Sequence, residues 1–596
     1  MHIPLQVSKS LPLCAKTSPI AAFVVACGLA ICAPTGLHGS PAGRPNVILI
    51  LTDDQGYGDV GFNGNPMVQT PTLDRYAGEG VVFDRFYAHP VCSPTRASLM
   101  TGRYSFRTGV TDTEGGASIL RPSEETIAEI LQSHGYKTGL FGKWHLGDNA
   151  PGRPIDQGFD QYLTHAGGMI GAPYSPLEAT SYFDPVLLDN GNEKKFEGYC
   201  VDIFTDEAIK FIKSAEGSPF FLFFAPNTPH HPLTVADRYA APYRERGLSE
   251  DTALYYGMIS NLDDNFKRLT DALEQLGEAE NTVIIFLGDN GTSSLHKQSD
   301  LWESGLRGRK TFVYENGIRV PMFVHFPGQS VTARRLTEPA AVEDILPTLL
   351  DYCGLKQAPA LDGRSLLPLL RQEVTSLPNR KLYFQFHRGA EPELYRNIAV
   401  IDFPFKLVQP TGRGATRVSR ETMEFELYDL QEDPYEKTDL AAKHPQVVER
   451  LKASYQEWFE EVTKSGFAPV PTWIGDDQQE KVRLSRQDWR GGGLADGELG
   501  VYEIDVRKSG TFKITCHWSA LLDQSHPTTL RIGDKILTKN ILYAEAQARF
   551  ETVFLPAGRC QLEAWIEFAD GKKGFRFIDI ERISDPGSFA TDRKLD

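Results

Sequence analysis

Short apolar runs recur through the first part of the chain and alternate with longer stretches of helical periodicity. Unbroken runs of this kind are typical of strands that are buried on both faces of a sheet. Strands are expected at residues 45–52, 80–88, 136–147, 220–225, 282–287 and 319–324. Helices are expected at residues 201–214 and 252–275, and residues 341–352 have the pattern of an amphipathic helix. The alternation predicts an α/β domain with a mainly parallel sheet over residues 41–335.

After residue 335 the pattern changes twice. Shorter strands and a helix at residues 445–464 predict a smaller α+β subdomain over residues 336–466. Residues 467–478 contain prolines and are expected to be a linker. Beyond them, apolar and polar positions alternate with the period of a strand, which predicts an all-β sandwich, an accessory domain, over residues 479–596.

The same alternation predicts which side chains of the sandwich enter its core. Cys516, Cys560, Trp518 and Trp565 are all expected on inward faces. The two cysteines can form a disulfide or remain as core thiols. Because inward tryptophans offer no platform for a sugar, a capping or assembly role for this domain is weighed equally with sugar binding.

The N-terminus has the composition of a targeting segment. Lys9 and Lys16 precede an apolar run at residues 20–33, which suits the core of a signal peptide and is too short for a transmembrane helix. Residues 1–40 are therefore predicted to be a signal peptide, and the protein to be exported to the periplasm or the medium. A lipoprotein anchor at residues 24–27 and an uncleaved anchor are the less favoured alternatives. No later run predicts a membrane span in the mature chain.

The net charge argues against one class of function, and the number of cysteines points to one candidate functional residue. The chain has 596 residues and a formal net charge of −16, which argues against sequence-independent binding of nucleic acid. Three of its eight cysteines lie in the predicted signal peptide, so five remain in the mature chain. An odd number in an exported protein points to one special thiol, and Cys92 is the candidate.

Cys92 lies where an expected strand gives way to a helix. Pro94 suits the first turn of a helix, because its missing N–H would have no partner there. The free N–H groups and the dipole at such a helix start favour negative charge. Arg96 adds a fixed cation one turn further on. The stretch predicts a nucleophile or electrophile in an anion-binding pocket.

Polar residues follow the ends of four expected strands. Ligands bind at the carboxyl edge of open α/β sheets, and these residues would meet there. They are Asp53 and Asp54, Lys143 and His145, His230 and His231, and Asp289 and Asn290. Carboxylate and amide oxygens suit a hard divalent cation. Lys143 and His145 are two residues apart on an extended chain, so both can face one pocket.

Taken together, these features resemble the arylsulfatase-like sulfatase family of the alkaline-phosphatase superfamily. Cys92-Ser93-Pro94-Thr95-Arg96 fits the Cys-x-Pro-x-Arg motif of that family, and Thr101-Gly102-Arg103 continues it. Further similar motifs are residues 45–58, 142–147, 306–310 with Glu315, 317–321 and 426–434. The resemblance covers residues 44–465 and implies an alkaline-phosphatase-like α/β fold for the catalytic part.

The resemblance implies that a dedicated maturation enzyme oxidises Cys92 to formylglycine. One hydroxyl of the formylglycine hydrate would attack sulfur and form a sulfate ester. Deprotonation of the other hydroxyl would then expel sulfate and restore the aldehyde. The resemblance also implies one Ca²⁺ ion, which would polarise a sulfate oxygen and lower the pKa of a diol hydroxyl. Its implied ligands are Asp53, Asp54, Asp289 and Asn290.

The remaining roles are also implied by the matching positions. Arg96 would hold the diol, and Lys143 would hold the sulfate. His145 would be the base that triggers release of sulfate. His230 and Lys310 would stabilise or protonate the leaving alkoxide.

Several alternatives stay open. His231 is the alternative to His230, because two adjacent histidines stand where the family has one. Export and the appended domain favour a sulfated carbohydrate as substrate. Residues 151–199 are expected to be loops, and the loops at residues 164–182 and 292–305, which contain His165 and His296, are expected to select the substrate. A phosphonate or phosphate monoester hydrolase of the same superfamily is the first alternative. A non-catalytic glycan-binding protein is the second, although the full set of metal, cysteine, lysine and histidine positions argues against it.

Overall fold

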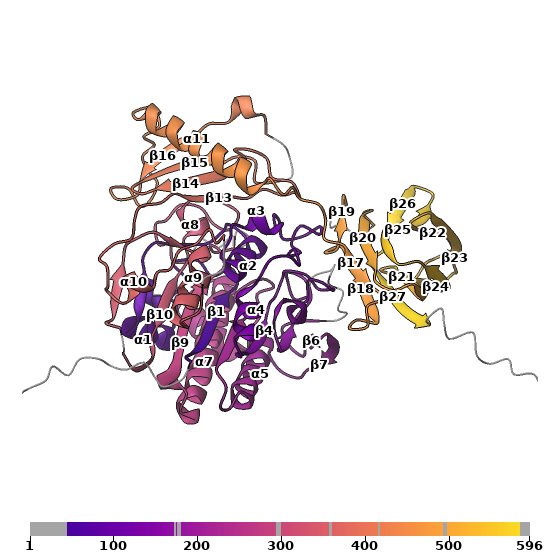
Figure 1. The fold of residues 1–596 in the computed structure, drawn as a ribbon, viewed down its shortest axis with the longest axis horizontal. Coiled ribbons are helices and arrows are strands. Elements are labelled where there is room, and N and C mark those ends of the chain that lie inside the picture. The colour runs from indigo at the N-terminus through magenta and orange to yellow at the C-terminus, as the bar shows by residue number, and fades with distance from the viewer. Residues whose placement is uncertain are drawn as a thin grey trace, which may run out of the picture. The chain divides into compact units, whose positions relative to one another are not determined.

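A large, mostly parallel sheet forms the centre of the N-terminal part (Figure 1). The computed structural model describes residues 44–171, 175, 180–293, 300–329, 331–356, 360–414, 418–492 and 497–584, so the predicted signal peptide and His296 lie outside the described residues. The sheet has ten strands in the order β11 (Arg334–Leu336), β2 (Val81–Phe83), β10 (Met322–His325), β9 (Thr282–Gly288), β1 (Asn46–Thr52), β8 (Phe220–Ala225), β4 (Lys137–Gly142), β5 (Gln161–Thr164), β6 (Val186–Asp189) and β7 (Asn192–Lys195). Strands β9, β1, β8, β4 and β5 run parallel, whereas β10, β6 and β7 run antiparallel to their neighbours. The predicted mainly parallel sheet is confirmed.

Helices cover both faces of this sheet. Alternate residues of β1 enter two separate cores, with Leu49 in one and Ile50 in the other. The first core includes α2 (Cys92–Thr101), α4 (Ile127–Ser133) and α9 (Ile345–Tyr352), and the second includes α1 (Pro71–Glu79), α5 (Cys200–Ser214) and α7 (Glu250–Leu276). The other helices of this part of the chain are α3 (Ser105–Thr108), α6 (Asp237–Glu245), α8 (Glu315–Ile318) and α10 (Leu367–Leu370). Burial on both faces explains why the strands are unbroken apolar runs.

Two expectations about this region were wrong. Residues 80–88 form two strands, because β2 ends at Phe83 and β3 (Phe86–Tyr87) pairs with β12 (Ala340–Ala341) in a separate small sheet. Residues 151–199 were expected to be loops, yet they contain β5, β6 and β7. Strand β7 is exposed throughout, so it lacks the apolar pattern that reveals a buried strand.

A second, antiparallel sheet follows in the chain. Its strands are β13 (Leu382–Gln385), β14 (Ile398–Asp402), β15 (Phe405–Gln409) and β16 (Glu426–Asp429), and α11 (Pro445–Val462) covers one face. A buried ion cluster ties this sheet to α8. Lys406 Nζ of β15 lies 2.9 Å from Glu315 Oε1 and 2.8 Å from Glu436 Oε1. Because a buried charge is costly without partners, this cluster fixes the chain around residue 315 beside the segment that carries Lys310.

The C-terminal region is all-β, as predicted. One sheet contains β17 (Thr472–Ile474), β20 (Val501–Val506), β25 (Gly558–Phe568), β22 (His526–Ile532) and β23 (Lys535–Ile541), with β19 (Trp489–Arg490) paired to β20 and β26 (Gly571–Gly574) paired to β25. The other contains β18 (Lys481–Leu484), β27 (Phe577–Ser584), β21 (Gly510–His517) and β24 (Gln547–Leu555). Inward side chains of the two sheets share one apolar core. Strand β17 lies within the residues that were expected to be a linker.

Cysteines and tryptophans of this region test the predicted alternation. Cys516 is buried and Cys560 is half-buried, and both are free thiols, so no disulfide joins them. Trp518 packs against the core with its ring 5.4 Å from that of Phe568. The prediction for Trp565 was wrong, because it alternates with inward Ala564 and Ile566 and lies half-buried on the opposite face.

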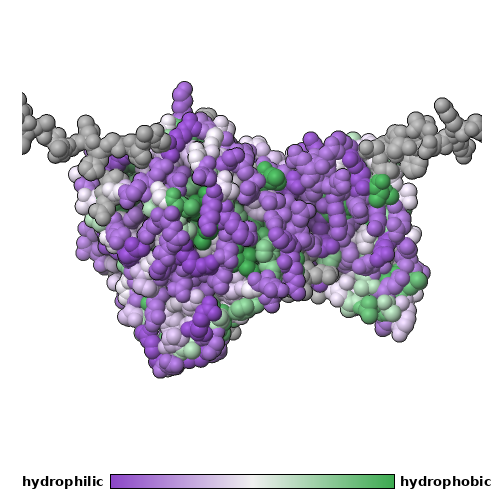
Figure 2. All heavy atoms as spheres, turned by 90° about the horizontal axis from the view of Figure 1, so that it is seen from below, coloured by the Kyte–Doolittle hydropathy of each residue, from purple (hydrophilic) through white to green (hydrophobic). Residues whose placement is uncertain are grey.

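The surface is mainly hydrophilic on the face drawn in Figure 2, where apolar residues form small, scattered patches. The large apolar side chains that are exposed include Leu521, Ile536 and Tyr543 of the all-β region. Isolated apolar residues of this kind are normal on a protein surface. Among the described residues, no helix combines the length and the apolar composition that crossing a bilayer requires.

Candidate active site

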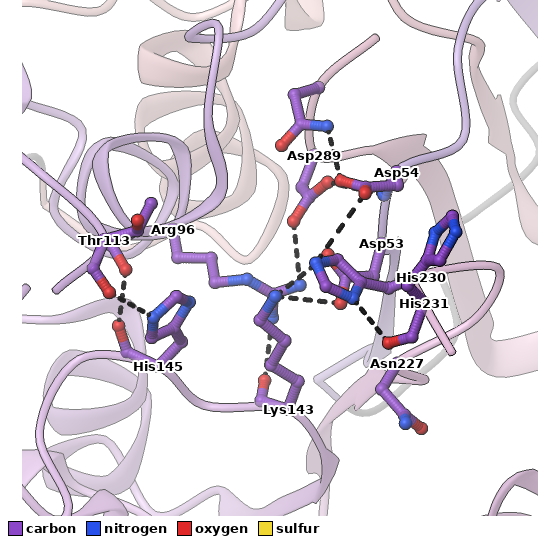
Figure 3. A network of polar contacts seen from close by, with 12 residues as sticks. Asp53, Asp54, Arg96, Thr113, Lys143, His145, Asn227, His230, His231 and Asp289 are labelled. Atoms are coloured by element: carbon purple, nitrogen blue, oxygen red, sulfur yellow. Dashed lines mark hydrogen bonds and ion pairs between the residues drawn. The ribbon is translucent and has the colours of Figure 1, made fainter. Parts of the chain in front are cut away.

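The ends of four neighbouring strands bring polar side chains to one place (Figure 3). Strands β9, β1, β8 and β4 are adjacent and parallel, so their carboxyl ends lie at the same edge. Asp289 and Asn290 follow β9, Asp53 and Asp54 follow β1, His230 and His231 lie in the loop after β8, and Lys143 and His145 follow β4. The structure therefore brings the residues predicted from strand ends into one site.

Each of three buried carboxylates has its own cation. Lys143 Nζ lies 2.9 and 2.8 Å from the two carboxylate oxygens of Asp53. Arg96 Nη2 lies 3.0 Å from Asp289 Oδ2, and Lys310 Nζ contacts Asp54 Oδ1. Removing an ionised carboxylate from water is costly without such a partner. The site therefore holds paired charges that are buried away from bulk water. In such surroundings charges act more strongly on a bound ion than they would in water.

The same pairs set the ionisation of the carboxylates. Burial raises the pKa of Asp53, but the nearby positive charges, that of Lys143 above all, together outweigh this effect and hold that pKa well below its usual range. Burial, together with the nearby negative charge of Asp53, raises the pKa of Asp289 to about 7. Three carboxylates this close therefore do not all ionise readily unless more positive charge enters the site.

A left-handed residue turns two adjacent carboxylates toward the same site. Asp54 has φ of 65°. Its N–H donates to Asp289 Oδ1 at 3.1 Å, and the N–H of Asp53 donates to Thr228 O at 3.1 Å. On an extended chain, neighbouring side chains would point to opposite sides. The rare conformation at Asp54 removes that alternation, and such strain is typical of functional sites.

The donor set fits a hard cation. Carboxylate oxygens of Asp53 and Asp54 lie within 4.8 Å of each other and of a ring nitrogen of His230. Asn290 Nδ2 donates to Asp54 Oδ1 at 2.9 Å, but Asn290 Oδ1 is buried and has no hydrogen-bond partner among the described residues. An orphaned amide oxygen beside carboxylates is a suitable ligand for Ca²⁺ or Mg²⁺.

Cys92 is the first residue of α2 and lies beside this donor set. Its Sγ is within 4.8 Å of carboxylate oxygens of Asp53 and Asp289. Helix α2 is buried along its whole length, and only 3% of Cys92 is exposed. Arg96, one turn later, also donates to Lys143 O at 2.7 Å, which fixes the backbone of the loop after β4. The helix start therefore places a single thiol among the charged groups of the site.

His145 lies on the other side of Arg96 and does not contact the carboxylates (Figure 3). Its Nε2 lies 2.8 Å from Thr113 O, and since a carbonyl can only accept, Nε2 carries the proton. Its Nδ1 is buried and has no partner among the described residues. Burial and the nearby Lys143 ammonium lower the pKa of His145 well below its usual range. A neutral ring with a free Nδ1 lone pair is suited to accept a proton.

The two adjacent histidines occupy different positions. His230 Nε2 lies 3.7 Å from Asp54 Oδ2, and its Nδ1 is 2.9 Å from His231 O. The hydroxyl of Tyr182 donates to His230 O at 2.6 Å, which holds this loop. His231 is half-buried, and burial lowers the pKa of both rings. His230 is thus the histidine that faces the carboxylates.

Sequence reasoning missed the residues that loops supply. Thr113 holds His145, and Arg388 Nη1 lies 2.7 Å from both Asp112 Oδ1 and Thr113 Oγ1. None of these follows a predicted strand or stands in a motif, so no local signal pointed to them. His165, which lies in a loop expected to select the substrate, is buried, and its Nδ1 lies 3.2 Å from Ala166 O. Burial lowers its pKa to about 3.

Comparisons with known proteins agree on one family. The Sulfatase family model matches residues 45–355, and the model "N-sulphoglucosamine sulphohydrolase, C-terminal" matches residues 305–462. The N-acetylgalactosamine-6-sulfatase of Mus musculus is 32% identical over 361 residues, which cover 56% of this chain and 68% of that protein. Arylsulfatase A of Homo sapiens is 32% identical over 491 residues, which cover 72% and 89%.

A solved structure extends the comparison to three dimensions. Ps i-CgsB in complex with k-i-k-neocarrahexaose is 27% identical, with a TM-score of 0.63, and the match covers 72% of this chain and 95% of that one. The matched regions contain the strands and helix that build the site described above. The chain therefore belongs to the sulfatase family and is a sulfuric ester hydrolase.

Proposed function

We propose that this sulfatase is exported and removes sulfate from sulfated carbohydrates, using a formylglycine made from Cys92 and a bound Ca²⁺ ion. The observation that carries the proposal is the position of Cys92 at the start of α2, within 4.8 Å of Asp53 and Asp289 oxygens. The N-terminal sequence pattern supports export. The names of two similar proteins, N-acetylgalactosamine-6-sulfatase and the neocarrahexaose complex of Ps i-CgsB, support a glycan substrate.

The residues around Cys92 suit the parts of this reaction. The formylglycine hydrate supplies one hydroxyl to attack sulfur and a second whose deprotonation releases sulfate. Asp53, Asp54, Asp289 and Asn290 would hold the Ca²⁺, whose charge would polarise a sulfate oxygen. Arg96 and Lys143 present fixed positive charge to the diol and to the sulfate.

Two histidines and one lysine are placed to accept a proton or to donate hydrogen bonds during the reaction. His145 Nδ1, which has no hydrogen-bond partner among the described residues, can take the proton of the second hydroxyl. His230 and Lys310 lie together beside Asp54 and can donate hydrogen bonds to the oxygen of the departing sugar. The site is thus divided into a group that attacks, a group that holds the sulfate and a group that stabilises the leaving oxygen.

The reaction class is tested by comparing esters directly. The mature protein, produced together with a formylglycine-generating enzyme, is offered an aryl sulfate, an aryl phosphonate monoester and a panel of sulfated oligosaccharides. We expect release of inorganic sulfate from at least one oligosaccharide, with a higher kcat/KM than for the phosphonate. More efficient turnover of the phosphonate would favour the phosphonate hydrolase alternative, and no turnover of any ester would favour a glycan-binding protein.

Replacing each adjacent histidine separately distinguishes their roles. His230→Ala is expected to lower kcat by about 10²-fold for a sugar sulfate, whose alkoxide is a poor leaving group, and less for an aryl sulfate. His231→Ala is the matched control, because it is the neighbour that does not face Asp54, and its effect should not depend on the leaving group. Equal sensitivity of the two variants to the leaving group would contradict the assignment of His230.

A further inference from the structure

The all-β region packs directly against loops near the candidate active site. The N–H of Gly116 donates to Gln487 O at 2.7 Å, and Asn149 Nδ2 donates to Asp488 Oδ1 at 3.2 Å. Gly116 has φ of 65°, and a Cβ there would lie 3.1 Å from Trp489 O. This close contact places β19, with Arg490, beside the loop that carries Asp112 and Thr113.

Arg490 is half-buried, and two nitrogens of its guanidinium are buried without a hydrogen-bond acceptor among the described residues. These nitrogens are Nε and Nη1. The acidic groups that act on it electrostatically are Glu391 and Asp112, and burial lowers its pKa. A guanidinium stays charged at any ordinary pH, and leaving its donors unpaired away from water is unfavourable. A ligand oxygen within hydrogen-bond reach of these donors would therefore stabilise this group.

Asp112, one of these two acidic groups, already has an ion-pair partner in Arg388. Arg388 Nη1 lies 2.7 Å from Asp112 Oδ1 and 3.3 Å from Glu114 Oε1, so its charge is already balanced. The same atom contacts Thr113 Oγ1, and Thr113 O holds His145. A continuous series of contacts thus leads from His145 through Thr113 and Asp112 toward Arg490, whose own charge has no ion-pair partner among the described residues.

We propose that Arg490 binds a second anionic group of the substrate, a carboxylate or an additional sulfate on the glycan, while the first sulfate is hydrolysed. This inference rests on the proposed function, because it needs a glycan at the site. A planar guanidinium suits either oxyanion, since both offer two oxygens to its fork of N–H groups. The all-β region would then contribute a substrate-binding residue and help to select polyanionic glycans.

Variants at Arg490 test this role with matched substrates. Arg490→Gln and Arg490→Lys are compared with Arg507→Gln, a control in the same region whose guanidinium is exposed and paired with Asp505. The substrates are a chondroitin 6-sulfate disaccharide and its carboxyl-reduced form, and κ- and ι-carrageenan oligosaccharides, the latter with an additional sulfate. An aryl sulfate serves as the reference.

For the wild type we expect a higher kcat/KM toward the member of a pair with the additional charge. Arg490→Gln should reduce this preference about tenfold, mainly through KM, and Arg490→Lys should reduce it less. Arg507→Gln should retain the preference. No preference in the wild type, or an equal loss for both members of each pair in Arg490→Gln, would overturn the inference. Absence of sulfate release from every ester, the aryl sulfate included, would instead contradict the proposed function.

Discussion

Cys92→Ala is expected to abolish turnover, with a loss of about 10⁴-fold or more, while the protein remains folded. Alanine lacks any group that can be oxidised to the aldehyde, so both proposed hydroxyls disappear together. The fold should tolerate the change, because Cys92 stands at the first position of α2, where a small side chain suffices. Initial rates with an aryl sulfate and with the best oligosaccharide, together with thermal unfolding, measure the two effects.

A variant of a second buried cysteine distinguishes loss of a catalytic group from loss of core packing. Cys516 is also buried, but it lies in the core of the all-β region, so Cys516→Ala should lower the melting temperature and keep kcat. The mass of the peptide that contains Cys92 provides a second measurement. In active wild-type protein one oxygen should replace the sulfur and two hydrogens, one from the thiol and one from Cβ. Native rates in Cys92→Ala, or active protein with unmodified cysteine, would refute the mechanism.

Removing divalent cations is expected to have the second-largest effect. Dialysis against a chelator should reduce kcat by about 10³-fold or more, and added Ca²⁺ should restore it. Three buried carboxylates meet in the site, and burial together with the charge of Asp53 raises the pKa of Asp289 to about 7. A dication relieves that repulsion, so Ca²⁺ should also raise the melting temperature, by mass action on the folded state.

Variants of buried aspartates identify where the cation acts. Asp289→Asn should lose both the activity and the rise in melting temperature with Ca²⁺. Asp263 is a matched control, because it is buried and accepts hydrogen bonds from the N–H groups of Thr72 and Leu73 at the start of α1. Asp263→Asn should keep the response to Ca²⁺. Full activity after exhaustive chelation, or an unchanged response in Asp289→Asn, would rule out a cation at this place.

The charged residues at the centre of the site could be predicted from the sequence, because each of them is marked by a pattern within a few neighbouring positions. Buried parallel strands are unbroken apolar runs, and the residues that follow them are polar where a ligand binds. Asp53, Asp289 and Lys143 all stand directly after such runs, and the structure brings them together. Cys92 was found in the same way, since a proline and an arginine after a strand mark the start of a helix. The alternation of side chains holds at Trp565, but the prediction assigned that residue to the wrong face.

Other parts of the site have no local signal. Lys143 pairs with Asp53 because β4 and β1 both flank β8, an order that the sequence does not contain. His145 was expected to point the same way as Lys143, but φ of 61° at His145 turns it toward Thr113 instead. A left-handed residue of this kind is held by its surroundings rather than by local preference.

By itself, the sequence determined the α/β class, the all-β C-terminal region and most of the charged residues at the centre of the site. These follow from periodicity and from residue types at strand ends, which act over a few positions. Tertiary structure alone decided which cation pairs with which carboxylate, which of two histidines faces Asp54, and that Arg490 lies near the site. Those outcomes depend on strand order and on contacts between residues hundreds of positions apart, and no short segment of the chain encodes them.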